Sequence, residues 1–138
     1  MFKLIYKYSL KKSIQIVFLV LISIGILLTI GRWYSAFNNE FVLFTDEINL
    51  HISNLSLSMI VYLGIGYSWI LSGVKFRNVI FLGVFLIIAN FICETLMGFM
   101  NTPDIIDAIY GTIGIVIAFV FLYIANRYGL MPNNENGV

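Results

Sequence analysis

Four long apolar runs, separated by shorter polar stretches, dominate the pattern of the chain. The runs cover roughly residues 13–31, 55–73, 78–100 and 103–126. Each is close to the 20 residues or so that an α-helix needs to cross a hydrocarbon core of about 30 Å. The pattern therefore predicts an all-α integral membrane protein, built as a bundle of four transmembrane helices.

Composition agrees with this class. The chain has 138 residues, of which 60% are hydrophobic and only 11% are charged, which is far from the composition of a soluble domain. The net charge of +1 comes without a basic patch interleaved with aromatic residues, so we expect no nucleic-acid partner. Cys93 is the single cysteine, which excludes an internal disulfide and a multi-cysteine metal site.

The regions before, between and after the runs set the expected domain organisation. Residues 1–12 carry four lysines among apolar residues and predict a basic amphipathic start on the cytoplasmic membrane surface. Residues 13–127 form a single transmembrane domain, and residues 128–138 predict a disordered cytoplasmic tail. The first run could also be a secretory signal, but it is long and residues 32–37 offer no small-residue cleavage site, which favours a retained span.

Basic residues predict the orientation. With four spans, seven of the eight Lys and Arg residues fall on the side of the two chain ends, and Arg32 alone falls on the other side. Both termini are therefore expected in the cytoplasm. Residues 32–53, rich in acids and aromatics, predict an interfacial segment on the outer side between the first two helices. Six of the seven acids gather on this outer side, which insertion does not require.

Glu94 is the acid most deeply embedded in an apolar run. It lies one turn from Asn90, on the same helical face, and about six residues inside the outer end of its run. A charge at that depth should face the bundle interior or a water-filled cavity, or be protonated. It is a candidate functional group, although a structural hydrogen bond to another helix would also explain it.

Asp104 and Asp107 open the fourth run. Asp104 follows Thr102 and Pro103, so a role at the helix N-terminus would explain it, although it could also belong to a binding site. Asp107 begins a stripe of small residues suited to packing against another helix, namely Gly111, Gly114 and Ala118. If that stripe packs on the face of Asn90 and Glu94, Asp107 and Glu94 come close together.

Two nearby carboxylates in a membrane need a neutralising partner, such as His51, Arg32, a substrate amine, a shared proton or a divalent cation. His51 stands at the outer start of the second run, one turn after Glu47, which could orient its ring. A lone interfacial histidine is more often a surface group. Its convergence with Glu94 and Asp107 makes these three the candidate catalytic residues, with Asp104, Glu47, Asn90 and Arg32 as candidate binding residues.

This order of motifs resembles the VanZ-like family of small membrane proteins. The residues that carry the resemblance are Asp46 or Glu47 with His51, then Glu94, then Asp104 and Asp107 with Gly114. Met97, Gly111 and the absence of an arginine at residues 101–102 depart from the family pattern. The resemblance implies a protein of the bacterial inner membrane that is linked to the cell envelope and, in one branch, to antibiotic resistance.

Three functions follow from these residues. The first is a VanZ-like protein whose outward-facing acidic pocket binds or modifies a lipid-linked envelope precursor or a lipid headgroup. The second is a non-enzymatic membrane partner, such as a toxin-immunity protein or a small subunit of a complex, with Gly111 and Gly114 in its interface. The third is a small proton-coupled transporter that works as a homo-oligomer, with Glu94 as the titrating group.

Overall fold

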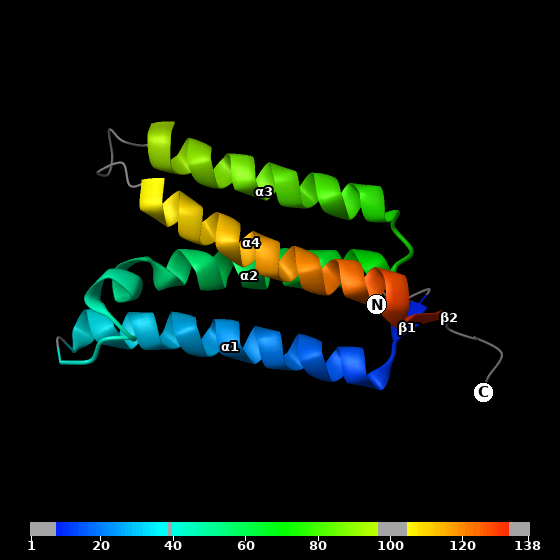
Figure 1. Ribbon diagram of the computed structural model, residues 1–138, viewed down its shortest axis with the longest axis horizontal. Coiled ribbons are helices and arrows are strands. Elements are labelled where there is room, and N and C mark those ends of the chain that lie inside the picture. The colour runs from blue at the N-terminus through cyan, green and yellow to red at the C-terminus, as the bar shows by residue number, and fades with distance from the viewer. Residues whose placement is uncertain (1–7, 39, 97–104, 133–138) are drawn as a thin grey trace, which may run out of the picture.

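The computed structural model describes residues 8–38, 40–96 and 105–132, and it is an all-α bundle of four helices (Figure 1). The helices are α1 (Lys12–Phe37), α2 (Asp46–Leu71), α3 (Phe76–Leu96) and α4 (Ile105–Ile124). Each is long and apolar enough to cross a membrane. The four-helix fold expected from the apolar runs is therefore confirmed, and the chain is a multi-pass membrane protein.

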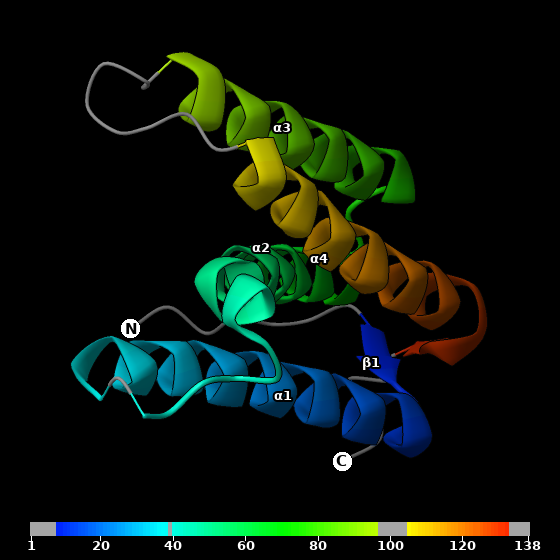
Figure 2. The ribbon, with the colours of Figure 1, turned by 60° about the vertical axis from the view of Figure 1, so that its left-hand side comes forward.

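Helix α2 is the central element of the bundle. Figure 2 shows α1, α2, α4 and α3 following one another across the molecule, and α2 packs against all three of the other helices. Its most extensive neighbour is α4. Most side chains of α1 and α3 face outward, as expected of helices that contact lipid on a broad side.

Buried side chains and hydrogen bonds between helices hold the bundle together. Tyr62, Leu63 and Leu122 are completely buried, and the Tyr62 hydroxyl donates a hydrogen bond of 2.8 Å to the backbone oxygen of Val79. Helix α1 joins α2 through a 2.8 Å hydrogen bond between the hydroxyls of Thr29 and Ser56. Internal hydrogen bonds of this kind satisfy polar groups that lipid cannot solvate.

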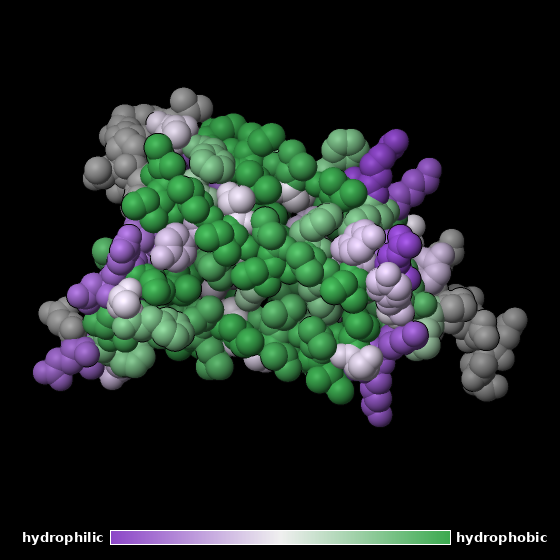
Figure 3. All heavy atoms as spheres, in the orientation of Figure 1, coloured by the Kyte–Doolittle hydropathy of each residue, from purple (hydrophilic) through white to green (hydrophobic). Residues whose placement is uncertain are grey.

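Charge divides the bundle into two ends on either side of an apolar belt, which is green in Figure 3. Among the described residues, Arg32 is the one cation at the acidic end. The basic end holds the other five: Lys11, Lys12, Lys75, Arg77 and Arg127. The acidic end, where α2 and α4 begin and α1 and α3 finish, holds the described acids: Glu40, Asp46, Glu47, Glu94 and Asp107.

A small antiparallel sheet at the basic end was not expected from the sequence. Strand β1 (Tyr8–Leu10) pairs with β2 (Leu130–Pro132), which follows a π-helical segment at Ala125–Gly129. The amphipathic start and the disordered tail predicted for these residues thus meet as strands. Leu10 explains the pairing physically, because its side chain is only 2% exposed and contributes to the hydrophobic core.

The connection between the first two helices is shorter than predicted. Helix α1 continues to Phe37 and α2 already begins at Asp46, so only residues 38–45 link them instead of a segment spanning 32–53. Thr45 caps α2, since its hydroxyl accepts a 3.2 Å hydrogen bond from the amide of Ile48. Arg32 and His51 consequently belong to helices and are held in fixed positions.

Candidate functional site

A histidine–aspartate pair joins α2 to α4 at the acidic end. His51 lies in the second turn of α2, and Asp107 lies in the first turn of α4. The His51 Nδ1 atom is 2.5 Å from the Asp107 Oδ1 atom. The His51 side chain is 9% exposed and that of Asp107 is 23% exposed, so the pair is largely enclosed but reachable from the Asp107 side.

The contact with Asp107 determines which nitrogen of the His51 ring donates a hydrogen bond and which accepts one. Because Nδ1 donates to a carboxylate, the neutral ring carries its acceptor at Nε2, and the protonated ring forms an ion pair. The Tyr110 ring lies 5.3 Å from the imidazole, centroid to centroid, and covers a further side. Such a pair can hold a proton next to a ligand, or pass one to it.

Glycines on α4 create the close approach that brings the pair together. A Cβ at Gly114 would overlap the backbone oxygen of Leu55 on α2, and a Cβ at Gly111 would lie 2.6 Å from the Asn90 amide nitrogen on α3. Ala118 is completely buried. Gly114 therefore packs against α2, while Gly111 lies between α2 and α3, so the packing on the third helix that the sequence suggested is found at Gly111 only. Gly111, Gly114 and Ala118 are thus buried within the described part of the chain.

Asn90 contributes to the site through α2. Its side-chain amide donates a 3.2 Å hydrogen bond to the Ser58 hydroxyl. Both residues line a cavity of about 210 Å³ between α2 and α3, together with Asn54. Asn90, a predicted binding residue, thus makes its contact with a neutral hydroxyl.

Glu94 does not join the histidine–aspartate pair. Glu94 lies near the end of the described part of α3 and is half-buried. Among the described residues it has no hydrogen-bonding or ion-pairing partner. The close approach of Glu94 and Asp107 that the sequence suggested is not found, because Gly114 turns the small face of α4 toward α2.

The other sequence-predicted binding residues lie apart. Glu47 is exposed, and the carboxylate bonded to the His51 ring is that of Asp107. Arg32 donates a 3.2 Å hydrogen bond to the Ser35 hydroxyl and lines a separate cavity of about 330 Å³ between α1 and α2. Asp104, with its capping neighbours, falls outside the described residues.

No metal centre is found within the described ranges. Residues 8–38, 40–96 and 105–132 contain no group of three or more His, Cys, Asp or Glu side chains placed to hold an ion. A cation held by His51, Glu94 and Asp107 together therefore has no support in the geometry of these residues.

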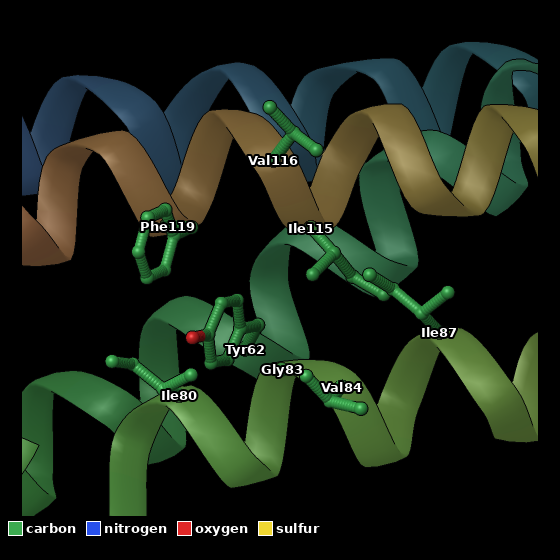
Figure 4. Close-up of a pocket in the computed structure, with 8 residues that line it drawn as sticks. All are labelled: Tyr62, Ile80, Gly83, Val84, Ile87, Ile115, Val116 and Phe119. Carbon is green, nitrogen blue, oxygen red and sulfur yellow. The ribbon is translucent and has the colours of Figure 1, made fainter. Parts of the chain in front are cut away.

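A second, apolar cavity lies deeper in the bundle and carries no chemistry of its own. Figure 4 shows it between α2, α3 and α4, lined by Tyr62, Gly83, Ile87, Ile115 and Phe119 among others. Its volume is about 230 Å³. The Tyr62 hydroxyl beside it is already bonded to Val79, so only hydrocarbon faces the space.

Three residues of the site were missed from the sequence. Tyr110 lies beside the pair, Asn54 and Ser58 line the cavity between α2 and α3, and none of the three was singled out as a polar partner. A signal existed for two of them, since Asn54 and Ser58 follow His51 at steps of three and four and share its helical face.

Comparison of the chain with protein-family models, with curated proteins and with solved structures finds no match. The resemblance to the VanZ-like proteins consequently rests on the residues quoted for it from the sequence.

Proposed function

We propose that this chain is a VanZ-like protein of the bacterial cytoplasmic membrane that binds a phosphate-bearing envelope lipid, or a lipid-linked envelope precursor, by its headgroup. The binding site is the His51–Asp107 pair at the acidic end, which faces outward because the basic end faces the cytoplasm. The observation that carries the proposal is the 2.5 Å contact between these two side chains, made across two helices at the edge of the apolar belt.

The chemistry of the pair suits a headgroup. An imidazole held by a carboxylate can donate a hydrogen bond to a phosphate oxygen when protonated, and can accept one from a hydroxyl when neutral. Ionisable groups placed at the ends of membrane helices are expensive to bury, and they are functional candidates for that reason. Exposed Glu47 and half-buried Glu94 lie at the same end of the bundle, and carboxylates there favour a headgroup that also carries donors such as hydroxyls or an amine.

The test is lipid binding by the purified full chain. Native mass spectrometry from detergent would measure binding of two probes, a phosphatidylglycerol and a polyprenyl phosphate, to the wild type, His51→Gln and Asp107→Asn. We expect about tenfold weaker binding of at least one probe in both variants, because a charge-assisted hydrogen bond is lost.

A matched control is Asp46→Asn, which removes an exposed acid of the same end without touching the pair. It should bind as the wild type does. Unchanged binding of both probes in His51→Gln and Asp107→Asn, with helicity retained by circular dichroism, would refute the proposal.

A further inference from the structure

The cavity between α2 and α3 is lined by uncharged polar groups. Asn54, Ser58 and Asn90 face it, with Leu57, Val61 and Leu86 completing the wall. Leu57 and Val61 are 49% and 43% exposed, so the space opens toward the lipid-facing surface. The Asn54 side chain has no hydrogen-bonding partner among the described residues.

The length of α1 between its two charged ends indicates how deep in the membrane this cavity lies. Lys12 and Arg32 are 20 residues apart, a rise of about 30 Å along a helix, which equals the thickness of the hydrocarbon core. Arg32 and Trp33 thus mark the outer boundary of the hydrocarbon. Their cavity shares Leu57 with the cavity between α2 and α3. The latter therefore begins at the boundary and extends just inside it, within one or two turns of His51.

An amide that faces hydrocarbon without a partner costs several kcal/mol, so an occupant with hydrogen-bonding groups is favoured here. Among the described residues, no charged side chain lines the space, which argues against a phosphate or an amine in it. The volume of about 210 Å³ exceeds what a single water molecule fills, at roughly 30 Å³ each.

The layering of a bilayer distinguishes the lipid classes that reach this depth. A glycerolipid places its glycerol and ester carbonyls just below the headgroup, where amide donors can bond to them. A polyprenyl lipid places only hydrocarbon there, and would leave the Asn54 amide unpaired, whereas the Asn90 amide keeps its bond to Ser58. The neutral polar lining matches the first arrangement.

We propose that the cavity lined by Asn54, Ser58 and Asn90 binds the ester-linked glycerol backbone of a diacylglycerol-based lipid whose headgroup lies at His51 and Asp107. This inference rests on the proposed headgroup site and names its ligand class. The lipid enters sideways between α2 and α3, past Leu57 and Val61.

The experiment compares two lipids that differ only in the linkage. Native mass spectrometry of the full chain would measure binding of a diester and a diether phosphatidylglycerol with the same headgroup and chain length. The wild type should prefer the diester about three- to tenfold, because the ether oxygens are poorer acceptors and lose about one hydrogen bond.

Two variants test whether the preference for the diester lipid arises in this cavity. Asn54→Leu and Asn90→Leu should bind both lipids equally, since each removes a donor to the carbonyls. Asn78→Leu is the matched control, because it makes the same change in an exposed asparagine at the basic end, and it should keep the preference. Helicity and thermal stability would confirm that all three variants fold.

The outcomes separate this inference from the headgroup site. Equal binding of diester and diether by the wild type, or a preference that survives both asparagine variants, overturns the inference even if His51→Gln and Asp107→Asn lose binding. A preference that depends on Asn54 and Asn90 supports the inference even if those two pair variants bind normally, in which case the headgroup proposal alone fails. A cavity that holds only water gives equal binding and also overturns it.

Discussion

The two halves of the α2–α4 interface are formed by different kinds of groups. Toward the basic end, apolar side chains such as Leu63 and Leu122 are completely buried, and Leu122 lies against Gly66. Toward the acidic end, the backbone of Leu55 meets Gly114, and His51 bonds to Asp107. The apolar half gains dispersion contacts, which drive helix association in lipid. The acidic half places polar groups where lipid cannot solvate them, which is an arrangement that stability alone does not require.

This contrast predicts which substitutions each half of the interface should tolerate. Substitutions in the apolar half should change stability and leave ligand binding unaffected in the molecules that remain folded. Substitutions of the polar groups in the acidic half should weaken ligand binding and change stability less. Gly114 is the exception, because it belongs to the acidic half by position but sets the distance between the two helices.

The largest effect is expected for Gly114→Leu. The new side chain would collide with the Leu55 backbone, which cannot swing away as a side chain can, so α2 and α4 must separate. We expect a loss of about 4 kcal/mol or more in the free energy of unfolding. Unfolding in mixed detergent–denaturant micelles, followed by circular dichroism, measures it. Gly64→Leu is the control, since nothing lies within 4 Å of its added Cβ. Equal stability of the two variants would contradict the close approach.

Leu122→Ala should come next and probes the apolar half. Leu122 is completely buried, and its methyl groups fill the space next to Gly66, so truncation leaves a cavity. We expect a loss of about 2–4 kcal/mol in the same unfolding assay. Leu27→Ala is the matched control, because Leu27 is 66% exposed to lipid and should lose less than about 1 kcal/mol. Similar losses in both variants would show that the apolar half is not packed as described.

Much of this fold could be predicted because its determinants are local. Apolar runs of membrane-spanning length define four helices without any knowledge of their partners. The strands at Tyr8–Leu10 and Leu130–Pro132 could not be predicted, since each is only three residues long and gains its partner from the opposite end of the chain. Residues 128–132 have a tail-like composition, and the docking of Leu10 at the basic end decides their structure.

His51, Asp107 and Asn90 could be singled out from the sequence, but the pairing of His51 with Asp107 could not. Helical periodicity correctly put Asp107, Gly111 and Gly114 on one face. Which helix that face meets depends on packing angles that periodicity does not contain. The structure turns it toward α2, so Asp107 reaches His51 rather than Glu94. The neutral lining at Asn54 was missed for a related reason, because an amide in an apolar run attracts less notice than a carboxylate.

A double-mutant cycle on His51 and Asp107 measures how strongly these two side chains of the acidic half interact. His51→Ala, Asp107→Ala and the double variant should reveal a coupling free energy of about 1–2 kcal/mol, at the upper end for interhelical hydrogen bonds in membranes. The unfolding assay used for the glycine variants supplies all four values. A cycle on exposed Glu47 with His51 provides the control and should give a coupling near zero. Coupling of the same size in both cycles would show that general charge, and not the described contact, is responsible.

The smallest effect should belong to Gly111→Ala, one turn from Gly114 on the same helix. Its added Cβ would lie 2.6 Å from the Asn90 amide nitrogen, which is the far end of a side chain and can rotate away. The hydrogen bond from Asn90 to Ser58 is lost when it does, so we expect a loss of less than about 1 kcal/mol in stability. In an Asn90→Ala background the obstruction is absent, and Gly111→Ala should then be neutral or slightly stabilising, since alanine favours the helix. A cost that persisted without the Asn90 amide would mean that backbone limits this position as it limits Gly114, and the acidic half would then be as rigid as the apolar half.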